Sequence, residues 1–108
     1  MWKAIDGFPK YAVSTDGQVK GPKGIMRPRD NGKGYKKVII RNESGKTEKY
    51  IHILVAEAFI PKREGCEVNH IDRDRGNCRA DNLEWLTHKE NMLYSRRRGA
   101  WANTKTNG

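Results

Sequence analysis

The stretch from Val68 to Asn77 reads VNHIDRDRGN and brings several residue types that can carry chemistry into one short polar run. Its histidine, His70, stands between an asparagine and two aspartates, and two arginines are interleaved with the aspartates. Histidine suits proton transfer because its ordinary pKa lies near neutral pH. The run therefore predicts a polar site in which His70 exchanges a proton, and it leaves the substrate open.

Four soft or borderline metal ligands in the same region offer a second chemistry. They are Cys66, His70, Cys78 and His88. Together they could bind zinc in a module that binds DNA without catalysis. Their spacings of four, eight and ten positions lack the close ligand pairs of ordinary zinc fingers. A zinc-stabilised DNA-binding protein therefore stays open as an alternative, although it gives the asparagines of this region no role.

The charge balance of the chain favours a polyanionic partner. Lys and Arg number 22 against 13 Asp and Glu, so the formal net charge is +9. Nucleic acid is the polyanion that this balance suits best, although ribosome-associated and merely well-solvated proteins share it. With 108 residues and 35% hydrophobic content, the chain has material for one small core and hence for one domain.

No part of the sequence predicts export or a membrane partner. The first ten residues, MWKAIDGFPK, contain acidic and turn-forming residues where a signal peptide needs an apolar run. The longest apolar stretch, ILVAEAFI, contains Glu57 and is too short to span a bilayer. We therefore expect a cytoplasmic protein in which Cys66 and Cys78 remain thiols.

The first half of the chain predicts two β-hairpins. In YAVSTDGQVK, residues 11–20, apolar residues alternate before the turn-forming run STDG and resume at Val19. The runs GYKKVIIR (34–41) and TEKYI (47–51) are rich in β-forming residues and are joined by a polar turn. Between the hairpins, residues 20–37 carry seven positive charges against one negative charge, and they form either a solvated loop or a phosphate-binding one.

The second half predicts a helix followed by two strands. The mostly apolar run HILVAEAFI (52–60) predicts a helix that packs into the core and ends before Pro61. His52 starts this helix, either in a structural role or in contact with a phosphate. A strand ending at His70 and a long polar loop then lead to the short strand LEWLT (83–87).

The last predicted helix has signals at both ends. Thr87 and Glu90 match the capping box, with the threonine as N-cap and the glutamate at N3, so the helix starts at His88. Gly99 is a suitable residue to end it, and three arginines precede Gly99 where the helix dipole favours cations. Residues 100–108 are mostly polar, and we expect them to form a flexible tail.

These elements resemble the HNH endonucleases. The segment VNHIDRDRGNCRADNLEWLTHKENM resembles the HNH motif, whose three named positions fall on His70, Asn82 and Asn91. WKAIDGFPKYAVSTDGQV resembles a short module that precedes HNH domains in phage and intron-encoded nucleases, and HILVAEAFIP resembles the helix that links the two. The resemblance implies one small α+β domain with N-terminal β-hairpins, a linking helix and a ββα-metal unit. Its segments would be a hairpin module at residues 1–50, packed with the remainder, a nuclease unit at 51–99 and a tail at 100–108.

The resemblance also implies a role for each motif residue. His70 would be the general base, and Asn82 would tie the loop so that His70 is oriented. Asn69 and Asn91 would bind one divalent metal ion, with Mg²⁺ expected and Mn²⁺ or another divalent ion as the alternative. Adjacent residues of a strand point to opposite faces, so Asn69 and His70 can serve one site only if the backbone turns there.

Basic residues around this site are expected to contact the DNA backbone. They are Arg73, Arg75 and Arg79 of the loop, His88 at the start of the last helix, and Arg96, Arg97 and Arg98 at its end. His88 would meet a phosphate at the helix N-terminus, where free amides favour anions, or simply lie on the surface. The arginines have the same alternative, because a charged run can be a solvated face.

The function that this resemblance implies is metal-dependent DNA cleavage. One site of this kind cuts one strand, so a monomer would nick DNA, whereas a double-strand break would need a homodimer or two visits. We expect no additional DNA-reading domain after the last helix, and a phage-encoded protein would work in the cytoplasm of the host cell. A degenerate HNH domain that only binds DNA stays open, because Asn69 is neutral where many family members have an acidic residue.

Overall fold

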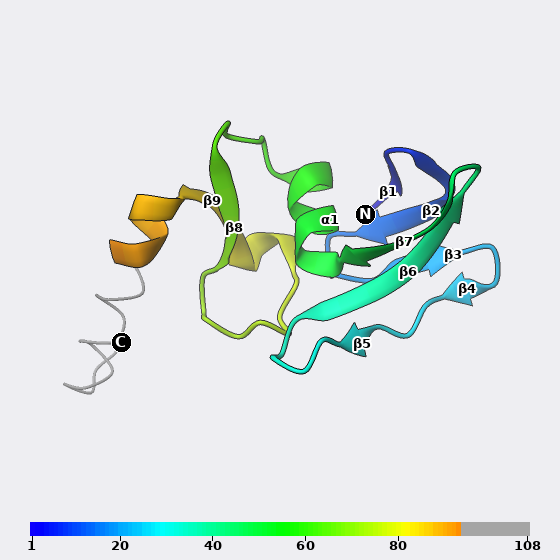
Figure 1. The fold of residues 1–108 in the computed structure, drawn as a ribbon, viewed down its shortest axis with the longest axis horizontal. Coiled ribbons are helices and arrows are strands. Elements are labelled where there is room, and N and C mark those ends of the chain that lie inside the picture. Colours follow the sequence, from blue (N-terminus) through cyan, green and yellow to red (C-terminus); the bar gives the residue numbers. More distant parts are fainter. Residues whose placement is uncertain (94–108) are drawn as a thin grey trace.

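The computed structural model describes residues 1–93, and it confirms the predicted α+β class (Figure 1). Its first sheet is antiparallel and has the strand order β1-β2-β3-β4. These strands are β1 (Trp2–Ile5), β2 (Phe8–Ser14), β3 (Val19–Gly21) and β4 (Gly24–Ile25). The turn between β2 and β3 forms because Ser14 Oγ accepts hydrogen bonds from the amides of Asp16 and Gln18. The predicted first hairpin is therefore present, with Val13 opposite Val19.

The second sheet contains the other predicted hairpin. Its strands are β5 (Arg29–Asp30), β6 (Lys36–Asn42) and β7 (Gly45–Tyr50), in that order. The basic connector at residues 20–37 is not one irregular loop, since β4 and β5 lie within it. Between β5 and β6, the Asp30 carboxylate accepts hydrogen bonds from the amides of Gly32 and Gly34, and this turn brings Tyr35 toward the second half of the chain.

The linking helix α1 (Ile51–Phe59) lies between the second sheet and the C-terminal elements (Figure 1). It ends before Pro61, as the sequence predicts. The helix buries Ile51, His52, Leu54, Val55 and Ala56. Ile53, although it belongs to the run that predicts a core helix, points outward and is 36% exposed.

The C-terminal elements form a two-stranded ribbon followed by a helix. They are β8 (Cys66–His70), the short 3-10 helix η1 (Ala80–Asn82), β9 (Leu83–Thr87) and a helical segment at residues 88–93. The capping box is present, because Thr87 Oγ1 accepts a hydrogen bond from the Glu90 amide and Glu90 Oε1 accepts one from the Thr87 amide. The predicted helix end at Gly99 and the tail at 100–108 lie outside the described residues.

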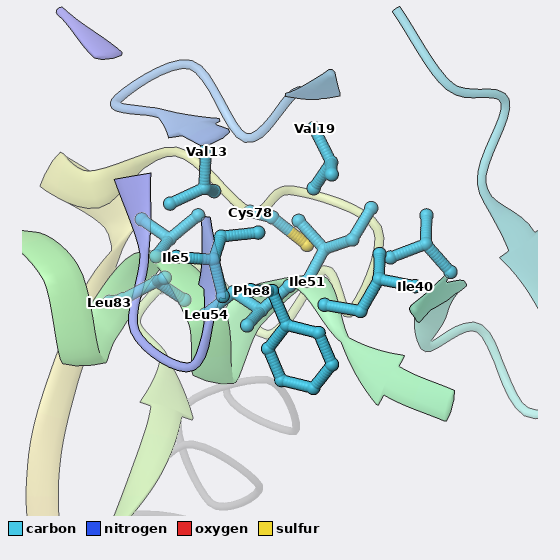
Figure 2. Close-up of a cluster of buried hydrophobic side chains, with 11 residues drawn as sticks. Ile5, Phe8, Val13, Val19, Ile40, Ile51, Leu54, Cys78 and Leu83 are labelled. Atoms are coloured by element: carbon cyan, nitrogen blue, oxygen red, sulfur yellow. The ribbon is translucent and has the colours of Figure 1, made fainter. Parts of the chain in front are cut away.

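One hydrophobic core joins the two halves of the chain. Figure 2 shows Cys78, from the loop before η1, among side chains of the first sheet and α1. The labelled members of this cluster are Ile5, Phe8, Val13, Val19, Ile40, Ile51, Leu54, Cys78 and Leu83. The loop between β8 and β9 is thereby anchored by a buried residue at its centre.

The tip of the first hairpin also contacts this loop directly. The Ala80 amide donates a hydrogen bond to the Thr15 carbonyl at 2.8 Å. Gly17 has φ +85° and lies so close to the loop that a Cβ atom there would fall 2.9 Å from the Cys78 carbonyl oxygen. Only glycine fits this position without strain. The hairpin therefore helps to set the course of the loop that follows His70.

None of the helices in residues 1–93 has the length and apolar character needed to cross a membrane.

Candidate active site

The end of β8 opens into a polar pocket of about 250 Å³. Its lining residues are Tyr35, Val68, Asn69, His70, Arg73, Arg75 and Asn91. They come from the β5–β6 turn, β8, the loop after β8 and the last helix. The structure therefore brings together three residues that the HNH resemblance singled out, namely Asn69, His70 and Asn91.

His70 is the last residue of β8 and is only 6% exposed. Its ring packs against His52 of α1, with the centroids 4.8 Å apart, and near Tyr35 at 5.9 Å. Burial lowers the pKa of His70, and Arg75 acts in the same direction, while the carboxylates of Asp72 and Asp74 oppose the shift. A histidine with a lowered pKa is neutral at neutral pH, which is the form that can accept a proton.

Asn69 and Asn91 reach the pocket from different elements. Asn69 and His70 keep the regular pairing of β8 with β9, opposite Glu84 and Leu83, and both line the pocket at the end of the strand, so no backbone turn between them is needed. The Asn69 Nδ2 donates a hydrogen bond to Glu84 Oε2 at 3.0 Å, and the Asn91 Nδ2 donates one to Glu67 Oε1. Each amide thus keeps its Oδ1 oxygen for another partner. Two amide oxygens at a polar pocket fit a hard divalent cation, which takes oxygen ligands.

Asn82 lies behind the pocket and holds the loop after His70. Its side chain is 8% exposed and makes three hydrogen bonds. The Oδ1 atom accepts from the Asp72 amide, while Nδ2 donates to Asp72 Oδ1 and to the Asn77 carbonyl. Hydrogen bonds from Asn77, the Asp74 amide and Asn82 lower the pKa of Asp72, so its carboxylate stays ionised. The loop is therefore a closed network around Asp72.

The arginines of the loop divide into two groups. Arg73 and Arg75 line the pocket. The Arg75 guanidinium lies 4.7 Å from the Tyr35 ring centroid and donates a hydrogen bond to the Lys33 carbonyl. Arg79 does not line the pocket, because its guanidinium pairs with Asp16 at 3.0 Å. The fold thus turns Arg79 toward the first hairpin, whereas the contact of all three arginines with the DNA backbone stays a prediction.

His88 is exposed at the start of the last helix, and its Nδ1 lies 3.7 Å from Glu67 Oε2. Its contact with phosphate stays a prediction. Arg96, Arg97 and Arg98 lie outside the described residues, so their contact with DNA stays a prediction as well.

The four predicted zinc ligands do not form a zinc site. Within residues 1–93, no three side chains of His, Cys, Asp or Glu gather into a group that could hold a metal ion. Cys78 instead packs in the hydrophobic core, where burial raises its pKa to about 11. The residue spacing and the fold therefore both speak against a zinc finger.

Three residues at or behind the site were not predicted to act there: Tyr35, Glu67 and Glu84. Tyr35 carried no sequence signal, because the Asp30 turn and the long-range packing of the second sheet decide its position. Glu84 pairs with Asn69 across the ribbon. The sequence does not predict this pairing, because the long irregular loop between the two strands leaves their register undetermined. Glu67 offered a weak signal, since alternation along β8 puts it on the same face as Asn69.

The chain matches two known sequence families. Residues 49–93 match the HNH endonuclease model, and residues 1–41 match the NUMOD4 motif. The chain is 37% identical over 103 residues to an uncharacterized HNH endonuclease of Acanthamoeba polyphaga mimivirus, covering 88% of this chain and 26% of that protein. It is 35% identical over 106 residues to the DNA endonuclease I-HmuI of Bacillus phage SP01, covering 91% of this chain and 59% of that protein.

A solved structure gives the same relationship in three dimensions. The structure describing DNA binding and cleavage by the HNH homing endonuclease I-HmuI matches this fold with a TM-score of 0.86 at 30% identity. The match covers 92% of this chain and 59% of that chain, so the present chain spans only part of the length of its relatives. The sequence matches and the shared fold show that this chain consists of a NUMOD4 motif followed by an HNH endonuclease domain and is a homologue of I-HmuI.

Proposed function

We propose that this protein is a metal-dependent DNA endonuclease that nicks one strand at a time. The observation that carries the proposal is the convergence of His70, Asn69 and Asn91 on one pocket that Arg73 and Arg75 also line. A proton acceptor, oxygen ligands for a divalent metal ion and positively charged side chains that hold a phosphate are groups that metal-dependent phosphodiester hydrolysis uses. The DNA endonuclease I-HmuI, which shares the fold, supports DNA as the substrate.

In this proposal each residue has one task. His70 accepts a proton from the attacking water, and because its Nε2 is enclosed without a hydrogen-bond partner in residues 1–93, Nδ1 is the nitrogen that takes the proton. Asn69 and Asn91 hold the divalent cation through Oδ1. Bound there, Mg²⁺ or Mn²⁺ would stabilise the charge that develops on the phosphate and on the leaving O3′. Arg73 and Arg75 hold the DNA backbone, and Asn82 keeps the loop in place.

Nicking is the outcome expected of a single site. One pocket holds one phosphate, so a monomer cuts one strand per encounter, and a double-strand break requires a homodimer or a second visit. Arg73 and Arg75 would recognise the charge and shape of the DNA backbone, because contacts with phosphates do not distinguish one base sequence from another. The target sequence therefore depends on contacts beyond this pocket.

The test is cleavage of supercoiled plasmid in the presence of Mg²⁺ or Mn²⁺. Wild-type protein should convert supercoiled DNA to the open-circular form, and EDTA should stop the reaction. His70→Ala should lower the nicking rate by about 10²- to 10⁴-fold, the usual effect of losing a general base, while its circular dichroism spectrum and DNA affinity stay near wild type. DNA binding without cleavage by the wild-type protein would instead identify a degenerate HNH domain.

A further inference from the structure

Both amides that are proposed to hold the cation have a glutamate as a hydrogen-bond partner. The Asn69 Nδ2 donates to Glu84 Oε2 at 3.0 Å, and the Asn91 Nδ2 donates to Glu67 Oε1. Both amides line the pocket, whereas neither glutamate does. In both contacts the amide N–H donates to the carboxylate, and the amide oxygen takes no part in the hydrogen bond.

The pairing of β8 with β9 creates this arrangement. Asn69 and Glu84 are direct cross-strand partners in the antiparallel ribbon, so their side chains lie on the same face. Glu67 is two positions before Asn69 on β8 and therefore shares that face. From there it contacts Asn91 at the start of the last helix. The polar face of the ribbon thus supplies one carboxylate to each amide, whereas the opposite face carries the buried Leu83 and Trp85.

An ionised carboxylate can only accept hydrogen bonds, which fixes how the amide is turned. An asparagine side chain has two N–H donors on one side and one oxygen acceptor on the other. A glutamate that faces the amide nitrogen therefore excludes the flipped orientation and keeps Oδ1 on the far side. The negative charge also polarises the amide, which makes its oxygen a stronger donor to a cation. Carboxylates that orient metal ligands in this way raise metal affinity in other sites.

We infer that Glu84 and Glu67 are positioning residues for the divalent cation, supplying through the two amides the negative charge that neutral ligands lack. This inference rests on the proposed function, because it assumes that Asn69 and Asn91 face the cation. It explains how two neutral amides can serve a cation without a carboxylate ligand of their own. It also assigns a task to two acidic residues beside a site that is otherwise built to attract polyanionic DNA.

The test is Mn²⁺ binding to the metal-free, DNA-free protein, followed by paramagnetic broadening of the Asn69 and Asn91 side-chain amide signals in NMR. This readout reports weak binding and does not depend on cleavage. Glu84→Gln keeps the size and an acceptor oxygen but removes the charge, and it should raise the Mn²⁺ dissociation constant by about 10- to 100-fold. Glu67→Gln should act in the same direction. Glu43→Gln, the same change in the β6–β7 turn at the far end of the molecule, should leave the constant unchanged (Figure 1).

A second readout in the metal-free protein checks the contact itself. The side-chain amide protons of Asn69 should shift in Glu84→Gln and stay in place in Glu43→Gln. An Mn²⁺ dissociation constant in Glu84→Gln and Glu67→Gln equal to that of wild type would overturn the inference while leaving the proposed function intact. Absence of any Mn²⁺ effect on both amides in the wild type, even at saturating Mn²⁺, would overturn the inference together with the metal ligands of the proposed function.

Discussion

The rings of His52 and His70 pack against each other with their centroids 4.8 Å apart and their planes inclined by 47°. Helix α1 thereby places a second histidine directly behind the proposed base. His52 is 7% exposed, and its Nδ1 has no hydrogen-bond partner within residues 1–93. Burial, assisted by the nearby His70, lowers the pKa of His52 to about 4. The residue is therefore neutral at neutral pH and has a structural role, which was one of the two alternatives left by the sequence.

The lowered pKa of His52 predicts a loss of stability in acid. In the unfolded chain this histidine takes up a proton near pH 6.5, whereas in the folded protein it does so only near pH 4. The unfolded state therefore binds more protons between these two pH values. The contribution of His52 to the free energy of unfolding is fully present above pH 6.5 and is lost as the pH drops toward 4, by roughly 3 kcal/mol in total. Urea unfolding at several pH values should show this fall. His52→Phe, which keeps an aromatic ring but cannot be protonated, should flatten the curve, and an unchanged curve would contradict the assignment.

We predict that the main role of Asn82 is to stabilise the loop and not to take part in catalysis. Asn82→Ala removes three hydrogen bonds and leaves the Asp72 amide and the Asn77 carbonyl without their partner. An unsatisfied polar group costs about 1–3 kcal/mol when it is buried, and these two groups are only partly buried, so the free energy of unfolding should fall by about 1 kcal/mol. Hydrogen exchange of the Asp72 amide should accelerate in the variant. Wild-type protection of this amide in Asn82→Ala would show that the loop is held by other contacts.

Asn69→Asp should have opposite effects on metal binding and on stability. A carboxylate holds a hard divalent cation by charge as well as by its oxygen, so calorimetry should show tighter Mg²⁺ binding than in wild type, which should bind Mg²⁺ weakly without DNA. In the metal-free protein the new charge would face Glu84, its cross-strand partner, and like charges in such pairs destabilise by up to about 1 kcal/mol. Adding Glu84→Gln should recover that loss in urea unfolding. A double variant no more stable than Asn69→Asp would contradict the pairing.

The two pocket arginines should contribute to the salt dependence of DNA binding. Each phosphate contact contributes a slope of about −0.9 to a plot of the logarithm of affinity against the logarithm of salt concentration. Arg73→Gln combined with Arg75→Gln should therefore flatten the slope by nearly two units. Arg79→Gln should change it less, because Arg79 is paired with Asp16 away from the pocket. Equal flattening by the Arg79 change would mean that DNA extends along the loop to the first hairpin.

Local patterns predicted much of this fold because they act over a few residues. The capping box at Thr87 and Glu90 needs only one helical turn, and its two hydrogen bonds are present in the structure. The two hairpins likewise follow from alternation and turn residues. The motif residues Asn69, His70 and Asn91 were found through their resemblance to a family, and the fold brings them to one pocket.

The residues that surround the site depend on contacts between distant segments. His52 and Tyr35 reach His70 only because α1 and the second sheet pack against the ribbon. Arg79 follows Arg73 and Arg75 closely in sequence, yet the turn around Asn77 and the ion pair with Asp16 carry it to another surface. Sequence spacing along an irregular loop does not determine such directions, since no fixed periodicity applies there.

The contact of Thr15 and Gly17 with the loop after β8 has a consequence for protein engineering. In the NUMOD4 segment, the Thr15 carbonyl accepts a hydrogen bond from the Ala80 amide, and Gly17 packs closely against Cys78. Grafting the HNH segment onto another scaffold would leave that amide and the buried thiol facing solvent. The two segments should therefore be transferred together, and fusion partners should be attached at positions away from the contact between the first hairpin and this loop.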